Sequence, residues 1–176
     1  MLNCSRGTGR VSTRLVALAP GKILISAGEA SGDRYAAMLV ERLRRCWPDA
    51  DFFGCAGPQM QRAGVRPVVE ASSLAVVGLV EVLTHIPRIY REFRKLVRAA
   101  EDTRPDLAIL TDSPDFHLRL AARLKRLGIP VIYLVAPQVW AWREGRVRTM
   151  RRVLDHLLCI FPFEEDYFRR HGVPVT

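Results

Sequence analysis

The stretch Lys22-Ile-Leu-Ile-Ser-Ala-Gly-Glu-Ala-Ser-Gly-Asp33 decides the fold class of this chain. Its apolar half, Lys22 to Ala27, ends abruptly at glycine and predicts a short buried strand. From Arg34 to Cys46, apolar residues recur at helical spacing with arginine and glutamate between them, which predicts an amphipathic helix. A strand followed at once by a helix is the unit from which α/β folds are built.

The turn between that strand and helix, Gly28 to Asp33, is a candidate binding site. Its two glycines let the backbone bend sharply and let a ligand approach closely. Ser31 is expected to cap the helix, which leaves free N–H groups and the positive end of the helix dipole at the mouth of the turn. Ligands of open α/β sheets bind at such a mouth, although many turns of this kind bind nothing.

The bulk properties predict one soluble domain with a sizeable core. The chain has 176 residues, 49% of them hydrophobic, and a formal net charge of +9 that comes mostly from arginine. Such a charge suits nucleic acid, an anionic membrane or a phosphorylated substrate, and it also suits ordinary solvated helix faces. Residues 1–21 are expected to be a disordered leader. The cysteines have no metal-type or paired spacing and are interpreted as reduced thiols of a cytosolic protein: Cys4, Cys46, Cys55 and Cys159.

Strands and helices alternate along the rest of the chain, which predicts a doubly wound, Rossmann-like parallel sheet. The last residues, 172–176, resemble the start of another strand. Further strands are expected at 51–55, 65–70, 106–111, 130–136 and 155–161, a turn with a short helix within 56–64, and helices at about 116–127 and 164–171.

Asp112 is the candidate for chemistry. It follows a buried strand directly, so its carboxylate is expected beside the ligand crevice, where it can act as a general base. Asp115 is interpreted as the cap of the next helix. Together with His117 these two aspartates could bind a metal, but two carboxylates and one imidazole within six residues are a weak signal.

Three other segments could contribute to a site. Gln138, Trp140 and Arg143 follow another strand, and such residues can stack on or hydrogen-bond a sugar, although core packing is the commoner use of tryptophan. A basic run continues through Arg152 and could pair with phosphate or face solvent. The segment Leu74 to Leu83 is apolar all round, so it is either buried or in contact with lipid. The helical stripe beyond it is interpreted as core: Leu83, Ile86, Tyr90, Phe93, Val97 and Ala100.

Five motifs occur here in the order found in bacterial lipid-A-disaccharide synthases, and this resemblance covers nearly everything from Lys22 to Thr176. It implies that residues 22–176 are the acceptor-side, N-terminal half of a GT-B type glycosyltransferase, with the C-terminal nucleotide-sugar domain absent. The motifs are Gly28-Glu-Ala-Ser-Gly-Asp33, Ala56-Gly-Pro-Gln-Met60, Leu74-Ala-Val-Val-Gly-Leu-Val-Glu-Val-Leu83, Asp112-Ser-Pro-Asp-Phe116 and Pro137-Gln-Val-Trp-Ala-Trp-Arg143.

The resemblance implies an inverting transfer of 2,3-diacylglucosamine from its UDP derivative to 2,3-diacylglucosamine 1-phosphate, without metal or cofactor and without nucleic acid. It implies that Asp112 is the general base. The implied substrate-binding residues are Gly28, Glu29, Ser31 and Gly32, to which the residues themselves add Gln138, Trp140 and Arg143. The apolar segment would meet acyl chains and the anionic inner membrane, to which the protein would attach from the cytoplasmic side: Leu74, Val76, Val77, Leu79, Val80 and Leu83.

Two departures from the family pattern stand out, since His117 occupies a position where asparagine is frequent and Ala30 one where threonine is frequent. Two other function classes stay open at this point. One is a non-catalytic module that holds a phosphorylated acyl-sugar at a membrane surface. The other is a metal-dependent hydrolase built on Asp112, Asp115 and His117. A dinucleotide oxidoreductase is disfavoured because the turn does not follow the G-x-G-x-x-G pattern.

Overall fold

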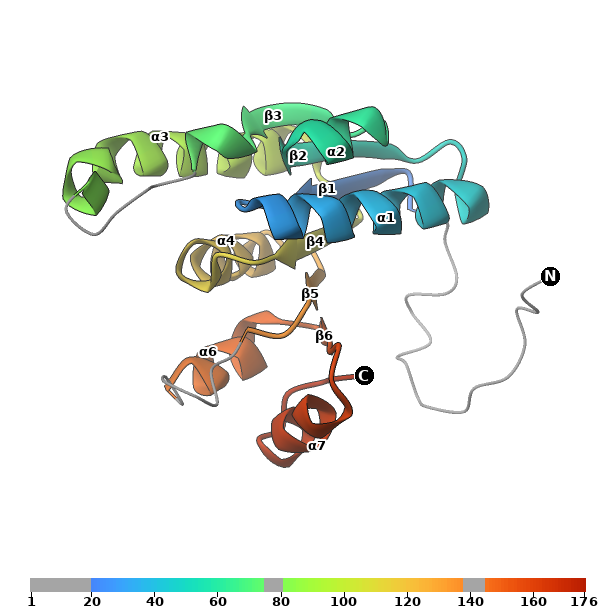
Figure 1. The fold of residues 1–176 in the computed structure, drawn as a ribbon, viewed down its shortest axis with the longest axis vertical. Helices are drawn as coiled ribbons and strands as arrows, with labels where there is room; N and C mark the ends of the chain where they lie inside the picture. Colours follow the sequence, from blue (N-terminus) through green and yellow to red (C-terminus); the bar gives the residue numbers. More distant parts are fainter. Residues whose placement is uncertain (1–19, 75–80, 138–144) are drawn as a thin grey trace.

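The computed structural model describes residues 20–74, 81–137 and 145–176, with side chains from residue 86 onward in the second range. Its centre is a six-stranded sheet with the strand order β3-β2-β1-β4-β5-β6, and all neighbouring strands are parallel (Figure 1). This is the strand order of a doubly wound dinucleotide-binding fold. The expected α/β fold class is therefore confirmed.

The elements follow one another with short connections. Their bounds are β1 (Lys22–Ser26), α1 (Ala30–Cys46), β2 (Asp51–Ala56), α2 (Pro58–Arg62), β3 (Arg66–Glu70), the 3-10 turn η1 (Ala71–Ser73), α3 (Glu81–Thr103), β4 (Leu107–Thr111), α4 (Pro114–Arg126), β5 (Val131–Leu134), α6 (Gly145–Val153), β6 (His156–Leu158) and α7 (Pro162–Arg170). Beyond α7, Val175 forms an isolated parallel bridge with Leu157, as the strand-like end of the sequence predicts.

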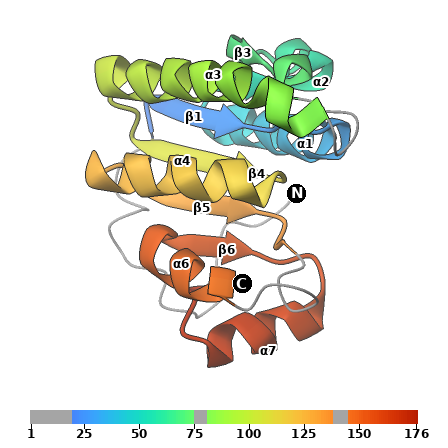
Figure 2. The ribbon, with the colours of Figure 1, turned by 90° about the vertical axis from the view of Figure 1, so that its left-hand side faces the viewer.

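Each face of the sheet has its own core, because side chains alternate between the faces along a strand. Leu24 and Leu110 face α3 and α4, whereas Ile23, Ile25 and Ile109 face α1 and α2. Figure 2 shows α3 and α4 side by side over one face of the sheet. Helices on both faces explain why β1 and β4 are apolar along nearly their whole length.

β1 and β4 are neighbours in the middle of the sheet, and the chain connections run in opposite directions on either side of them. The connection after β1 leads through α1 to β2, and the connection after β4 leads through α4 to β5. Such a switch of direction leaves a crevice at the carboxyl ends of the two strands. Gly28 and Asp112 both lie at this point.

The interpretation of the stripe along α3 as core is wrong for its N-terminal part. Ile86 and Tyr90 are 51% and 60% exposed, whereas Ala100 at the other end of the stripe is fully buried. Leu96, which the stripe does not include, is also fully buried. The N-terminal end of α3 projects beyond the strands (Figure 1), so its apolar face has no sheet to pack on. In the described part of the chain, no helix is both long and apolar enough to span a membrane.

Candidate functional site

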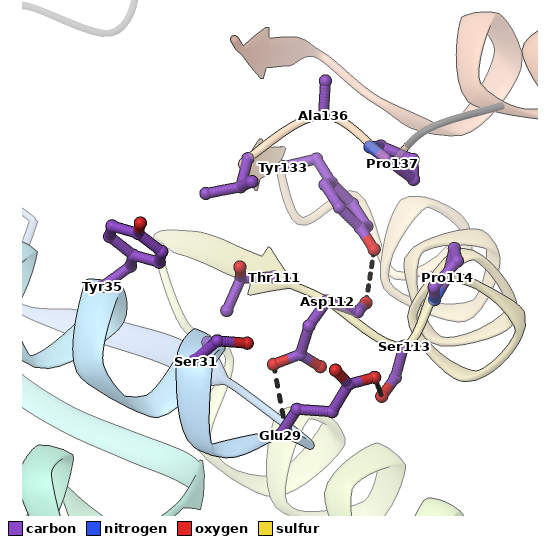
Figure 3. A pocket seen from close by; sticks show the side chains of 12 residues that line it. Glu29, Ser31, Tyr35, Thr111, Asp112, Ser113, Pro114, Tyr133, Ala136 and Pro137 are labelled. Atoms are coloured by element: carbon purple, nitrogen blue, oxygen red, sulfur yellow. Dashed lines mark hydrogen bonds between the residues drawn. The ribbon is translucent and has the colours of Figure 1, made fainter. Parts of the chain in front are cut away.

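A cleft of about 250 Å³ opens at the carboxyl ends of β1, β4 and β5. Figure 3 shows the side chains that face it, which come from the N-terminal part of α1, the end of β4 with the start of α4, and β5 with the segment that follows it. The lining residues are Glu29, Ser31, Gly32, Tyr35, Thr111, Asp112, Ser113, Pro114, Tyr133, Val135, Ala136 and Pro137.

The Asp112 carboxylate reaches from the end of β4 to the N-terminus of α1. It accepts hydrogen bonds from the backbone N–H of Gly28 at 2.9 Å and from that of Glu29 at 3.1 Å. Gly32 makes this approach possible, because a Cβ at that position would lie 1.7 Å from Asp112 Oδ2. The glycine turn therefore serves to admit a carboxylate from the neighbouring strand.

Burial raises the pKa of the Asp112 carboxyl from 3.8 to about 6. The N–H groups of Gly28 and Glu29 and the hydroxyl of Ser113 favour the charged form and oppose this rise, whereas the nearby Glu29 carboxylate adds to it. A carboxyl with this pKa is mostly ionised at neutral pH and is still a stronger base than an exposed aspartate. Such a value suits a general base.

Backbone strain is concentrated around the cleft. Asp112, Ser113 and Val135 have φ values of 54°, 35° and 68°, and among the described non-glycine residues only Arg104 shares this left-handed region. A β-branched residue such as Val135 rarely adopts it. Strained residues of this kind gather at active sites and ligand clamps.

Two of the predicted helix caps are wrong. Ser31 is the second residue of α1, with Glu29 at the N-cap, and the side-chain acceptor at this helix N-terminus is the Asp112 carboxylate from β4. Asp115 lies in the first turn of α4 after the N-cap Ser113, and its carboxylate pairs with Arg146 of α6. In both cases the interaction at the helix N-terminus involves a residue distant in the sequence.

The structure does not bring Asp112, Asp115 and His117 together as metal ligands. His117 is fully buried, and both ring nitrogens are occupied: Nε2 lies 2.8 Å from Ser26 Oγ, and Nδ1 lies 2.9 Å from the backbone carbonyl of Asp112. Burial lowers the pKa of His117 to about 4, so the ring is neutral. Within the described ranges, no group of three or more histidine, cysteine or acidic residues is placed to hold a metal ion.

Four of the predicted site residues line the cleft: Glu29, Ser31, Gly32 and Asp112. Gly28 is buried behind it and donates its N–H to Asp112. Leu74 is half-buried and lines an adjoining pocket together with Glu29 and Ser113. The predicted residues outside the described backbone or side chains are Gln138, Trp140, Arg143, Val76, Val77, Leu79, Val80 and Leu83.

Several residues around Asp112 belong to the site but were not predicted from the sequence. The hydroxyl of Ser113 donates to Glu29 Oε1 at 3.2 Å, and that of Tyr133 donates to the backbone carbonyl of Asp112 at 2.5 Å. Ser113 and Thr111 adjoin Asp112 at the end of β4, so the strand-end rule that selected Asp112 could also have selected them. Tyr133 lies inside an apolar strand, and Ser26 ends one as a fully buried residue; a lone hydroxyl in such a run gives no such signal.

The comparisons with known proteins agree with this architecture. Residues 23–176 match the model of the family described as Lipid-A-disaccharide synthetase. Among curated relatives, a lipid-A-disaccharide synthase of Solibacter usitatus is 68% identical over 155 residues, which are 88% of this chain and 41% of the relative. One from Myxococcus xanthus is 53% identical over 154 residues, 88% of this chain and 40% of the relative. The chain thus spans about two-fifths of their length.

Solved structures with the same fold are more distant in sequence. MurG from Acinetobacter baumannii superposes with a TM-score of 0.55 at 15% identity, over 81% of this chain and 42% of MurG. A UGT transferase from Siraitia grosvenorii in complex with UDP has a TM-score of 0.55 at 10% identity, over 88% of this chain and 49% of the transferase. These two show the fold, and the family match over residues 23–176 shows the kinship: the chain belongs to the lipid-A-disaccharide synthetase family.

Proposed function

We propose that this chain forms the acceptor-side half of a lipid-A-disaccharide synthase. The whole enzyme would transfer 2,3-diacylglucosamine from its UDP derivative to 2,3-diacylglucosamine 1-phosphate, with inversion, and release UDP. The observation that carries the proposal is the Asp112 carboxylate, which lines the cleft, is held by two backbone N–H groups and has a pKa of about 6.

In this reaction Asp112 would take the proton from the 6′-hydroxyl of the acceptor as its oxygen attacks the anomeric carbon of the donor. Inversion needs a single displacement, so one base on the acceptor side is enough. Retaining glycoside hydrolysis, by contrast, uses two carboxylates. The negative charge that develops on the departing diphosphate requires cationic or helix-dipole partners, which we assign mainly to the nucleotide-sugar domain.

The other proposed substrate contacts follow from the lining of the cleft. Glu29 and Ser31 lie on the rim beside Asp112, where they can accept or donate hydrogen bonds to sugar hydroxyls. Because UDP contacts are assigned to the other domain, residues 1–176 alone should bind UDP weakly and should not transfer sugar. Calorimetry that found tight UDP binding to this chain would contradict that assignment.

We also propose peripheral attachment to the cytoplasmic face of the inner membrane through the apolar segment from Leu74 to Leu83. The exposed side chains of Ile86 and Tyr90 on α3 extend the apolar character of that segment. Exposed arginines lie on the same helix and would meet anionic headgroups, at roughly 1 kcal/mol each before screening by salt: Arg88, Arg91, Arg94 and Arg98.

Sedimentation with anionic vesicles tests the attachment. Replacing Val76, Leu79 and Leu83 together with serine should give a folded protein that no longer sediments with vesicles containing phosphatidylglycerol. The pair Ile86→Ser and Tyr90→Ser, at positions exposed in the structure, should weaken sedimentation in the same direction. Unfolding of the triple variant would show that the segment is core, and unchanged sedimentation of both variants would remove the membrane proposal.

The catalytic proposal is tested in a hybrid enzyme, in which residues 22–176 replace the matching part of the Solibacter usitatus relative. Asp112→Asn should lower kcat by roughly 10²- to 10⁴-fold, the range typical for loss of a general base. Its far-ultraviolet circular dichroism should stay unchanged. Near-normal turnover at neutral pH would remove Asp112 from the mechanism.

A further inference from the structure

The turn that carries Asp112 has a strained backbone, and it requires stabilising contacts from the surrounding structure. Asp112 and Ser113 are consecutive left-handed residues, with φ of 54° and 35°, at the point where β4 gives way to α4. Residues with a Cβ rarely adopt this conformation, because the Cβ crowds the following carbonyl oxygen. Strained residues persist only where the surrounding contacts over-determine them.

Two buried side chains hold this turn through a single backbone atom, the carbonyl oxygen of Asp112. His117 Nδ1 lies 2.9 Å from this oxygen, and Tyr133 Oη lies 2.5 Å from it. Figure 3 shows the Tyr133 ring reaching the backbone of Asp112 from the side opposite to the glycine turn. A carbonyl oxygen has two lone pairs, so these two donors saturate it.

Ser26 fixes the orientation and the tautomer of the His117 ring. The carbonyl of Asp112 is an acceptor only, so Nδ1 must carry the proton, and Nε2 is then left to accept a hydrogen bond from the Ser26 hydroxyl at 2.8 Å. Ser26 is the last residue of β1, two positions before Gly28, whose N–H binds the Asp112 carboxylate. Asp112 is therefore held at both ends by groups that β1 aligns.

We infer that Tyr133 and His117 are positioning residues, which act through the backbone carbonyl of Asp112 to keep its carboxylate at the glycine turn. The inference rests on the proposed role of Asp112 as the base. With the carbonyl anchored inward, the carboxylate lies toward Gly28 and Glu29 at the cleft. Without that anchor the strained turn is free to relax, and the carboxylate moves away from these N–H groups.

Amide hydrogen exchange in the 176-residue chain tests the positioning directly. Tyr133→Phe removes one hydroxyl from a buried ring without changing its shape. The amides of Gly28 and Glu29 should then exchange at least tenfold faster, while amides of the strand cores, such as Ile25, keep their rates. The matched control Tyr90→Phe removes a hydroxyl from a 60% exposed ring and should change neither amide.

Two variants of His117 separate the hydrogen bond from the bulk of the ring. Asparagine places an N–H donor near the position of Nδ1, whereas leucine fills space and offers no donor. Exchange at Gly28 and Glu29 should therefore accelerate in His117→Leu and be largely restored in His117→Asn. If His117→Leu does not fold, Tyr133→Phe decides the question alone.

Kinetics of the hybrid enzyme then separate positioning from general destabilisation. Tyr133→Phe should lower kcat about 10- to 100-fold with KM within about twofold, since small misplacements of a catalytic group have effects of this size. In an Asp112→Asn background the same change should have no further effect on kcat, because residues that act as a unit are not additive.

Three results would overturn the inference: unchanged exchange at Gly28 and Glu29, equally faster exchange throughout the chain, or a full further loss of kcat in the Asp112→Asn background. None of these would contradict the proposed function, which depends on Asp112→Asn alone. Conversely, normal turnover of Asp112→Asn would end the proposed role of Asp112 as the base, and selective exchange at the two amides would still be expected from the geometry.

Discussion

Asp33 and Asp112 use the same interaction for different purposes. Asp33 is 3% exposed and accepts backbone N–H groups from Gly57, Gln59 and Met60 at 2.9 to 3.1 Å, which ties α1 to the start of α2. Asp112 accepts N–H groups from Gly28 and Glu29 but lines an open cleft. Hydrogen bonds to backbone N–H groups therefore do not distinguish a functional carboxylate from a structural one. What distinguishes Asp112 from Asp33 is that its carboxylate lines the cleft.

The largest effect that would sharpen this contrast is expected at Gly32, inside the first turn of α1. Alanine normally stabilises a helix relative to glycine by up to about 1 kcal/mol. Here the new Cβ would lie 1.7 Å from Asp112 Oδ2, so Gly32→Ala should displace the carboxylate and lower kcat of the hybrid enzyme roughly 10²-fold. Gly145→Ala, at the first residue of α6, is the control: no atom of the described residues lies within 4 Å of the added Cβ, and kcat should stay unchanged. Equal kcat in both variants would contradict the close approach.

The second effect concerns stability and the other aspartate. Asp33→Ala leaves three backbone N–H groups at the start of α2 without their acceptor, and two of these hydrogen bonds are buried. The substitution should therefore lower the unfolding free energy by about 3 kcal/mol. Asp49→Ala, at an exposed position between α1 and β2, should cost less than about 0.5 kcal/mol. Urea denaturation of the 176-residue chain measures both. A small loss for Asp33→Ala would mean that these bonds do not hold α1 to α2.

The sequence predicts the location of Asp112 in the fold, but it does not predict the hydrogen-bond partners of either aspartate. The alternation of apolar strands with helices, and the position of Asp112 directly after one of those strands, were enough to predict a parallel sheet with Asp112 beside its ligand crevice. They could not predict that the Asp112 carboxylate would take the place expected for the Ser31 hydroxyl, because that depends on which strands become neighbours. The same holds for Asp33, whose partners lie 24 to 27 residues away.

The hydrogen bonds that hold the Asp112 carbonyl and the His117 ring could not be predicted from the sequence, for a similar reason. Tyr133 and Ser26 are single hydroxyl residues in apolar strands, and only the register of β1, β4 and β5 brings them to Asp112 and His117. Helical periodicity likewise identified the apolar stripe on α3 but not where the sheet beneath it ends, so Ile86 and Tyr90 were expected in the core.

A smaller effect is expected in the pH dependence of stability, where the buried groups act in opposite directions. The pKa of His117 is lowered from 6.5 to about 4, so its contribution to stability is present above pH 6.5 and is lost as the pH falls toward 4. The pKa of Asp112 is raised to about 6, so its contribution is present below pH 3.8 and is lost as the pH rises through 6.

His117→Asn removes only the first of these two contributions. Between pH 7 and pH 4 the unfolding free energy of the variant should therefore improve relative to the parent chain by about 3 kcal/mol. Urea titrations of both proteins at several pH values give this difference. A constant difference across that range would show that His117 does not resist protonation in the fold.

If the ionised Asp112 carboxylate is the base, its protonation must stop the reaction, and the pH profile of kcat/KM in the hybrid enzyme measures this. We expect kcat/KM to fall tenfold per pH unit below a midpoint near pH 6, where Asp112 becomes protonated. The phosphate of the acceptor also titrates near pH 6, so the profile of Asp112→Asn is the decisive comparison. Its residual activity should lose this acid limb. An acid limb with the same midpoint in Asp112→Asn would assign it to the substrate and contradict the account.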